Sequence, residues 1–333
     1  MNFRRRTFTR ALLLVLACAT SLGLMECTKH SATAAAQTAA PELTLDLKTP
    51  FQFVAYGDTR FHDPSDTDDA NPSARRALVE AIAQASPAFI CFTGDIVYNG
   101  NDADDWKVWE TETSPWREKK IPVFPALGNH DLHGEQAALV NYFQRFPQLK
   151  GSRYYSVRAA NVLLLVIDSA LEELSGPQGT WLADKLDHVP PEVDFVFIMD
   201  HHPPYTSSSD EKKYGGGHSS RPHEQALAKM LEQRQAQARY RIVFFSGHVH
   251  NYERHEHGGI TYFVSGGGGA HAYPIERAPG DPFQSKEINY HYLVVEVDHQ
   301  QLKVTMHRLE LNGDKATWTT PDQVVIPGPA VAK

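Results

Sequence analysis

The strongest constraint on the fold is a repeated pattern of five short apolar runs, each ending in a polar cluster of Asp, Asn or His. Stretches with the spacing of amphipathic helices lie between them, including residues 73–85 and 222–237. This order, in which a strand with a polar end is followed by a helix and another strand, is that of βαβ units. The pattern therefore predicts a mainly parallel sheet. The five runs are FQFVAYGD (51–58), AFICFTGD (88–95), IPVFPALGNHD (121–131), FVFIMDHHPPY (195–205) and YRIVFFSGHVH (240–250).

Two regions depart from this order and are typical of strands joined by tight turns. One covers residues 154–169, and the other, near the C-terminus, covers residues 260–266, 289–298 and 301–311. These segments predict antiparallel strands in addition to the parallel ones. The chain shows no internal repeat and no second domain boundary, so residues 47–328 are expected to form one α/β domain.

The polar residues that end the runs are candidates for a metal site. In open α/β sheets, ligands bind beyond the carboxyl ends of the strands, where side chains from several strands meet. Carboxylate, amide and imidazole groups suit divalent or trivalent first-row metals, and two such ions about 3.5–4 Å apart can clamp a phosphoryl group. The alternative is that strand ends carry histidine by coincidence, since the chain has 17. The candidates, too many for one ion, are Asp58, Asp95, Asn129, His201, His248 and His250.

Five short motifs resemble the calcineurin-like metallophosphoesterase superfamily. They are GDTR (57–60), GDIVY (94–98), GNHD (128–131), IMDHHPPY (198–205) and GHVHNYER (247–254), in that order. The Asp-x-x-Tyr of the second motif and the whole last motif resemble the purple acid phosphatase branch. The resemblance extends from residue 51 to about residue 275. It implies a four-layer αββα sandwich of two mixed β-sheets flanked by helices, with metals at one sheet edge.

The resemblance also implies a role for each ligand. Asp58 and His250 would hold the first metal, Asp95 would bridge both ions, and Asn129, His201 and His248 would hold the second. Tyr98 would ligate the first metal through its phenolate. A phenol ionises at neutral pH only beside a strongly Lewis-acidic ion, which favours ferric iron. The expected cofactors are therefore two ions, iron with zinc, manganese or a second iron; the alternative for Tyr98 is packing at the start of a helix.

Three further residues are candidates for contact with substrate. His130 would hydrogen-bond the phosphate or protonate the leaving alkoxide. Arg60 departs from the family pattern, because this position is His in many members and usually Gly in purple acid phosphatases. Arginine cannot ligate a metal but can bind phosphate with two hydrogen bonds; the alternative is an ion pair with the acidic segment 62–69. His202 contacts substrate or only shapes its turn.

The loop that follows the fourth run, residues 207–222, contains His218. Long loops beside ligand strands often cover active sites, and the alternative is a loop that is merely solvated.

These features predict a dinuclear phosphoesterase in which a metal-bound hydroxide attacks phosphate monoesters of small molecules. A phosphodiesterase or nucleotide hydrolase on the same site is the main alternative, and a non-catalytic metal- or phosphate-binding protein is a weaker one. The net charge is −8, and about −12 without the first 34 residues, which argues against a nuclease or any nucleic acid partner. The sequence does not predict an oligomeric state.

The N-terminus is typical of an export signal. Residues 1–34 combine a basic start, an apolar stretch too short to span a bilayer and small-residue cleavage sites, and residues 35–46 follow as a linker. The basic start resembles a twin-arginine motif, with the ordinary secretory route as the alternative. A lipid anchor at Cys18 or Cys27 is less favoured. The mature protein is expected in the periplasm or outside the cell, without a transmembrane span and with Cys91 buried and unpaired.

Overall fold

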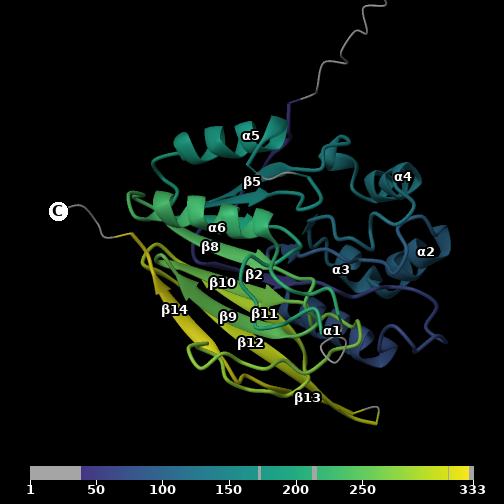
Figure 1. Ribbon diagram of the computed structural model, residues 1–333. Coiled ribbons are helices and arrows are strands. Elements are labelled where there is room, and N and C mark those ends of the chain that lie inside the picture. The colour runs from purple at the N-terminus through teal and green to yellow at the C-terminus, as the bar shows by residue number, and fades with distance from the viewer. Residues whose placement is uncertain (1–38, 172–173, 212–215, 314, 330–333) are drawn as a thin grey trace, which may run out of the picture. The chain divides into compact units, whose positions relative to one another are not determined.

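The computed structural model describes residues 39–171, 174–211, 216–313 and 315–329. In these residues the strands form two mixed sheets (Figure 1). The first sheet has the spatial order β1 (Glu42–Leu45), β5 (Tyr155–Ala159), β6 (Val162–Val166), β7 (Phe195–Met199), β8 (Arg241–Ser246), β10 (Ile260–Ser265) and β9 (Tyr252–His257). The second has the order β13 (Lys315–Thr319), β12 (Gln301–Asn312), β11 (Tyr290–Val297), β2 (Phe51–Tyr56), β3 (Ile90–Phe92) and β4 (Val123–Pro125), and β14 (Gln323–Pro327) pairs with β12.

The five apolar runs of the sequence form parallel strands in both sheets. In the second sheet β2, β3 and β4 are parallel, and in the first sheet β6, β7, β8 and β10 are parallel. The predicted antiparallel segments are found as β5 against β6 and β11 against both β2 and β12. β10 is antiparallel to β9, a strand that the sequence pattern did not predict, and parallel to β8. Each sheet is therefore mixed, as expected.

Helices cover the outer faces of the two sheets. Apolar residues of α5 and α6 pack on the first sheet, and α1 packs against β11 and β12 of the second. This arrangement confirms the four-layer αββα sandwich (Figure 1). The helices are α1 (Pro72–Ala85), α2 (Ala103–Glu112), α3 (Ser114–Glu118), α4 (Gln136–Arg145), α5 (Gly176–Asp187) and α6 (Pro222–Gln235), with a 3₁₀ turn at Pro147–Leu149.

The main hydrophobic core lies between the two sheets. The ring of Phe53 on β2 lies 5.1 Å from that of Phe197 on β7 and 6.2 Å from that of Phe245 on β8. Their sequence neighbours Ile198 and Phe244 point the other way, into the core beneath α5 and α6. Because both faces of these strands are covered, the runs are apolar throughout instead of alternating. Each fully buried side chain of this kind contributes about 1.5–3 kcal/mol.

The domain begins earlier than the predicted residue 47. Glu42–Leu45, inside the predicted linker, form β1, which pairs in parallel with β5. Leu43 and Leu45 pack against the core between the sheets. Four residues are too few for an alternating pattern to stand out, so this strand depends on its pairing with β5. The export segment 1–34, with Cys18 and Cys27, and linker residues 35–38 lie outside the described residues.

The structure adds elements that the sequence pattern did not predict. Residues 103–118 form α2 and α3, which bury Trp106 and Trp116, and the C-terminal strands β13 and β14 extend the second sheet. Cys91 is buried and unpaired, as expected.

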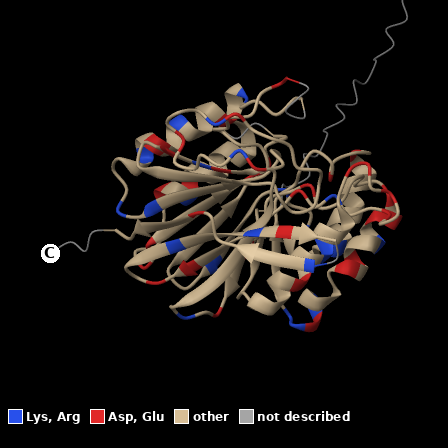
Figure 2. Ribbon diagram, turned by 90° about the horizontal axis from the view of Figure 1, so that it is seen from below, with Lys and Arg blue, Asp and Glu red and all other residues tan. Residues whose placement is uncertain are grey.

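The charged residues are mixed along the described chain. In the view of Figure 2, acidic and basic positions intersperse on the helices and loops, without a continuous basic run. Among the described residues, no helix combines the length and apolar character needed to cross a membrane.

Candidate metal centre

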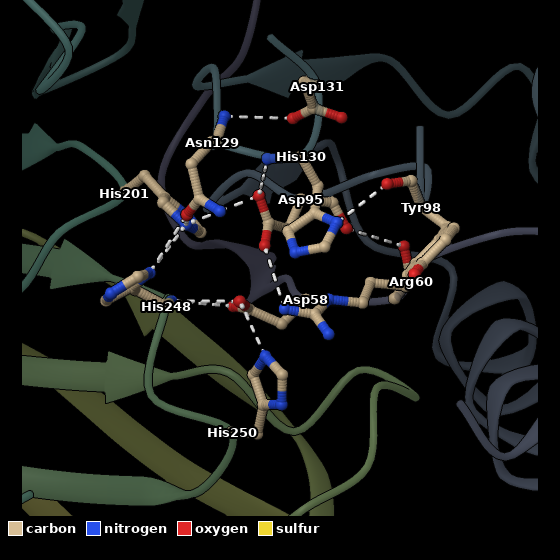
Figure 3. Close-up of polar contacts among 12 residues, drawn as sticks. Asp58, Arg60, Asp95, Tyr98, Asn129, His130, Asp131, His201, His248 and His250 are labelled. Carbon is tan, nitrogen blue, oxygen red and sulfur yellow. Dashed lines mark hydrogen bonds and ion pairs between the residues drawn. The ribbon is translucent and has the colours of Figure 1, made fainter. Parts of the chain in front are cut away.

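The predicted ligands lie on loops that leave the carboxyl ends of parallel strands from both sheets. Three loops follow β2, β3 and β4 of the second sheet, and two follow β7 and β8 of the first. The polar side chains on these loops converge in one place (Figure 3). Six of the seven predicted ligands are thus brought together: Asp58, Asp95, Asn129, His201, His248 and His250.

Four of these side chains form a compact group, here called the second half-site. Asn129 Oδ1 lies 3.0 Å from His201 Nε2 and 3.1 Å from His248 Nδ1. The two histidine nitrogens are 3.3 Å apart, and Asp95 Oδ1 is 3.4 Å from His201 Nε2. Two ligands at about 2.1 Å from a common ion are themselves about 3.0–3.4 Å apart. The spacing of these donors therefore fits one bound metal ion.

The three candidate ligand imidazoles are oriented by backbone carbonyls. In each ring one nitrogen contacts a carbonyl oxygen and the other points to the centre, an arrangement that fixes the tautomer and the direction of a metal-binding histidine. Burial lowers the pKa of His248 and of His250, so the neutral form that binds metals is favoured. The carbonyl contacts are His201 Nδ1 to Thr93 (2.9 Å), His248 Nε2 to Gly217 (3.2 Å) and His250 Nδ1 to His271 (2.9 Å).

The remaining donors form a wider group, here called the first half-site. Ligand atoms of Asp58, Asp95 and His250 lie within 4.8 Å of one another, with His250 Nε2 3.7 Å from Asp58 Oδ1. Asp95 Oδ2 and His250 Nε2 are buried and make no hydrogen bond. Buried polar atoms without partners are costly, and a cation among them would satisfy both. Because Asp95 directs its other oxygen to the second half-site, its position fits a bridging carboxylate.

Glycines allow these loops to approach the carboxylates closely. A Cβ atom at residue 128 would lie 2.2 Å from Asp95 Oδ1, and one at residue 247 would lie 2.3 Å from Asp58 Oδ2. Both distances are shorter than any van der Waals contact, so only glycine fits. The glycines before these candidate ligands therefore allow close packing of the loops.

The pKa values of the two carboxylates at the centre are shifted in opposite directions. Burial and the negative charge of Asp95 raise the pKa of Asp58. Burial also opposes ionisation of Asp95, but the neighbouring His201, His130 and Arg60 outweigh it and hold the pKa of Asp95 well below its usual range. Of the two carboxylates, Asp95 is therefore the one whose ionised form is favoured by its neighbours.

Tyr98, the seventh predicted ligand, is placed beside the centre with its hydroxyl turned to Asp69. The negative charge of Asp69, burial and a hydrogen bond between the two side chains raise the pKa of Tyr98. Its ring lies 5.4 Å from that of His130. Ligation by Tyr98 requires the hydroxyl to leave Asp69, and it stays a prediction.

His130 follows the candidate ligand Asn129 and lies on the edge of the centre. Its backbone N–H donates to Asp95 Oδ1 at 2.9 Å, and its Nδ1 lies 2.7 Å from the carbonyl oxygen of Tyr98. Since a carbonyl only accepts, Nδ1 carries a proton and Nε2 is the nitrogen that gains or loses one. Burial lowers the pKa of His130 to about 4.

His202 lies beside the second half-site. Its ring is 4.2 Å from that of His248, and its nitrogens group with those of His201 and His248. Nδ1 is 2.7 Å from the hydroxyl of Ser169, which follows β6. Ser169 therefore fixes the orientation of His202 and leaves Nε2 available for another partner.

Arg60 points into the centre instead of toward the acidic segment 62–69. Its Nη2 lies 3.8 Å from Asp95 Oδ2, and its side chain is 15% exposed. The alternative ion pair with the acidic segment does not occur among the described residues, which include the whole segment.

Asp131 has a part in the site that the sequence reasoning did not assign. It is fully buried, and its carboxylate accepts hydrogen bonds from the backbone N–H groups of Ile96 (2.9 Å), Val97 (3.3 Å) and Gly128 (3.0 Å). It therefore ties the loop of Asp95 to the loop of Asn129. The signal was present, since Asp131 is the last residue of GNHD.

The loop before α6 reaches the centre. His218 is 9% exposed, and its ring lies 4.7 Å from that of His248 and 5.7 Å from that of His250. The carbonyl of Gly217 contacts His248. Of the two alternatives for this loop, its described part agrees with the one that covers the site.

Comparison with known proteins agrees with this geometry. Residues 51–252 match the calcineurin-like phosphoesterase family. The chain belongs to that family. It is a metallophosphoesterase with candidate residues for two metals and a distant relative of the purple acid phosphatases.

Two plant proteins illustrate the relationship. The chain is 27% identical over 208 residues to phosphoenolpyruvate phosphatase of Allium cepa. This alignment covers 56% of this chain and 40% of the relative. It is 28% identical over 178 residues to purple acid phosphatase 23 of Arabidopsis thaliana. That alignment covers 50% of this chain and 36% of the relative. The chain thus spans less than half the length of these curated relatives.

A solved structure shows the same fold. The purple acid phosphatase PPD1 from seeds of yellow lupin, Lupinus luteus, superimposes with a TM-score of 0.65 at 15% identity. The superposition covers 78% of this chain and 52% of the lupin protein.

Proposed function

We propose that the protein is an exported, acid phosphatase-like enzyme that uses two metal ions to hydrolyse phosphate monoesters of small molecules. The observation that carries the proposal is the second half-site, whose donor atoms lie 3.0–3.4 Å apart, the spacing that one metal ion requires. Asp95 directs its other oxygen to the first half-site, so one carboxylate joins the two. The similarity to purple acid phosphatases supports the preference for monoesters.

Bound at these donors, two cations would supply the Lewis acidity that holds phosphate oxygens and activates water. Oxygen and imidazole donors suit iron, zinc and manganese alike. We propose iron in the first half-site, with zinc, manganese or a second iron in the other. The choice of iron rests on Tyr98, which must exchange its hydrogen bond to Asp69 for the metal.

His130 is proposed to deliver the proton to the leaving oxygen of the ester. Its Nδ1 is committed to the carbonyl of Tyr98, so the transferred proton is held at Nε2. Burial favours the neutral ring, with a pKa of about 4. A phosphate dianion beside it favours the imidazolium instead, because an opposite charge stabilises the charged form. Binding of substrate therefore prepares His130 as a general acid.

Arg60 and His202 are proposed to orient the phosphate group. The guanidinium of Arg60 lies at the first half-site, where two parallel N–H groups fit two phosphate oxygens. His202 lies at the second half-site, and Ser169 holds its Nδ1, so Nε2 is the nitrogen proposed to contact the phosphate. The two residues thus approach the phosphate from different sides.

The proposal is tested with Asp95→Ala and Asn129→Ala in the full chain. Hydrolysis of p-nitrophenyl phosphate and of bis(p-nitrophenyl) phosphate is measured with metals added, and circular dichroism checks folding. Loss of a ligand is expected to lower kcat at least about a hundredfold, more than loss of an outer partner does. Asp63→Ala is the control, since Asp63 is exposed and its carboxylate accepts hydrogen bonds from Ser65 outside the metal centre.

Each outcome decides between the candidate functions. Full activity in a folded Asp95→Ala or Asn129→Ala variant contradicts the enzyme assignment. Hydrolysis of the diester alone supports the phosphodiesterase alternative. Two bound metals without hydrolysis of either ester support the non-catalytic alternative.

We also propose that residues 1–34 direct export to the periplasm or the medium. Replacing Arg5 and Arg6 by lysine tests the route. Loss of export in a bacterial host favours the twin-arginine pathway, whereas unchanged export favours the ordinary secretory route.

A further inference from the structure

A guanidinium occupies the edge of the first half-site. Arg60 Nη2 lies 3.8 Å from Asp95 Oδ2, too far for a hydrogen bond but close enough for an ion pair. Arg60 Nε, Asp95 Oδ2 and His250 Nε2 are all buried without a hydrogen-bond partner. Figure 3 shows the guanidinium flanked by Asp58, Asp95 and His250, the same side chains that would bind the first metal. These three atoms therefore meet without hydrogen bonds, whereas the other polar atoms of Asp58, Asp95 and His250 contact backbone groups.

The backbone of Arg60 is fixed, so the side chain cannot withdraw by a shift of the loop. Residue 60 has φ +46°, and its N–H donates to the carbonyl of Asp95 at 3.1 Å. Its carbonyl oxygen accepts from His62 Nδ1 at 2.6 Å and from Arg75 Nη1 at 3.1 Å. Arg75 is itself fully buried and paired with Glu112. Only rotation of its own side chain can move the guanidinium of Arg60.

The two half-sites differ in this respect. The donors of the second half-site lie 3.0–3.4 Å apart. Among the described residues, no lysine or arginine is paired with Asn129, His201 or His248, and Arg60 approaches the shared Asp95 through Oδ2, the oxygen of the first half-site. In the first half-site the carboxylate of Asp95 is already partly neutralised by Arg60. A metal ion entering it meets a like charge held close by, which opposes binding.

We propose that Arg60 makes the two metal sites unequal. It competes with the first metal for Asp95, so the first half-site binds its ion more weakly than the second. An anionic phosphate relieves this competition, because its oxygens match the two parallel N–H groups of the guanidinium better than a single carboxylate oxygen at 3.8 Å does. Phosphate and the first metal therefore bind cooperatively, and the coupling passes through Arg60.

The inference rests on the metal centre of the proposed function, but its test measures binding and not turnover. Metal-free full chain is titrated with Zn²⁺ by calorimetry, with and without inorganic phosphate. Arg60→Gly removes the cation at a residue whose positive φ suits glycine. Arg60→Lys keeps the charge without the planar fork. Lys120→Gly is the matched control, because Lys120 also has positive φ (+56°) and is exposed.

We expect the weaker of the two metal sites to bind Zn²⁺ more tightly in Arg60→Gly than in the unmodified protein. Without phosphate, its affinity for the second equivalent of Zn²⁺ rises at least about tenfold, which corresponds to about 1.4 kcal/mol, whereas the tight site stays the same. Phosphate tightens the weak site of the unmodified protein at least about tenfold more than that of Arg60→Gly. In Arg60→Lys the weaker site keeps its low affinity for Zn²⁺, and phosphate no longer raises that affinity by much. Lys120→Gly matches the unmodified protein.

Two results overturn the proposal. One is that the weaker site of Arg60→Gly binds Zn²⁺ with the same affinity as that of the unmodified protein. The other is that Lys120→Gly gains as much Zn²⁺ affinity as Arg60→Gly does. Failure of the proposed function is recognised separately. Two Zn²⁺ ions bound with the expected difference, but no ester hydrolysed, would contradict the phosphoesterase activity and leave the role of Arg60 in place.

Discussion

Asp131 offers the sharpest test of how the ligand loops are held, because it touches no proposed metal site. In Asp131→Asn the amide oxygen can still accept from Ile96 and Val97, but the NH₂ group then faces the N–H of Gly128. One buried backbone donor is left unpaired, at a cost of about 1–3 kcal/mol. For a domain of this size, about 2 kcal/mol lowers Tm by about 4–8 °C.

The same change should weaken metal binding at the second half-site. Gly128 precedes Asn129, so release of its N–H displaces a donor that lies 3.0 Å from His201 Nε2. Loss of an outer-shell partner typically lowers metal affinity about 10- to 100-fold. Thermal unfolding of the metal-free chain and Zn²⁺ titration measure the two effects. Asp63→Asn, at an exposed carboxylate, is the control and should change neither. Unchanged Tm and unchanged affinity in Asp131→Asn would refute the proposed clamp.

Three further predictions follow from single residues. His291 is fully buried, and burial followed by the charge of Arg277 lowers its pKa to about 3. The unfolded chain therefore binds more protons below about pH 6.5, and stability should fall by up to about 1.4 kcal/mol per pH unit from there to pH 3. Urea unfolding from pH 7 to 4 should show a shallower loss in a folded His291→Gln variant, and an equal loss contradicts the assignment. Gly247→Ala places a Cβ against Asp58 and should lower the free energy of unfolding by about 1–3 kcal/mol. It should also weaken metal binding at the first half-site, and a Zn²⁺ affinity equal to that of the unmodified protein would contradict this packing. Iron-loaded protein should absorb visible light through Tyr98, and a Tyr98→Phe variant that keeps the band shows that the phenolate is not a ligand.

The fold and most of the site were accessible from the sequence because their signals are local. Each of these buried strands is a continuous apolar run, and each predicted ligand follows its strand within a few residues, as Asp58 follows β2 and His248 follows β8. Parallel strands bring their carboxyl ends together, so the position of the ligands required only strand order. Six of the seven predicted ligands therefore lie together.

The rest depends on contacts between segments distant in sequence. The backbone of Arg60 is held in its left-handed conformation by a hydrogen bond from Arg75 to its carbonyl oxygen, and a motif reveals neither feature. The hydroxyl of Tyr98 is turned by Asp69, from a loop that the motifs do not include. Strand β1 has only four residues and exists through pairing with β5 more than a hundred positions away. Such features are decided by tertiary neighbours and carry little local pattern.

The most direct test of the central claim is the metal content of the full chain measured together with its hydrolysis of p-nitrophenyl phosphate. The protein is stripped with a chelator, reloaded with iron and zinc, and analysed by elemental analysis after removal of free ions. The account predicts two ions per chain, no hydrolysis in the stripped protein, and recovery of hydrolysis in step with loading. Hydrolysis that persists in the metal-free protein, or a fully loaded chain that cleaves no phosphate ester, would contradict it.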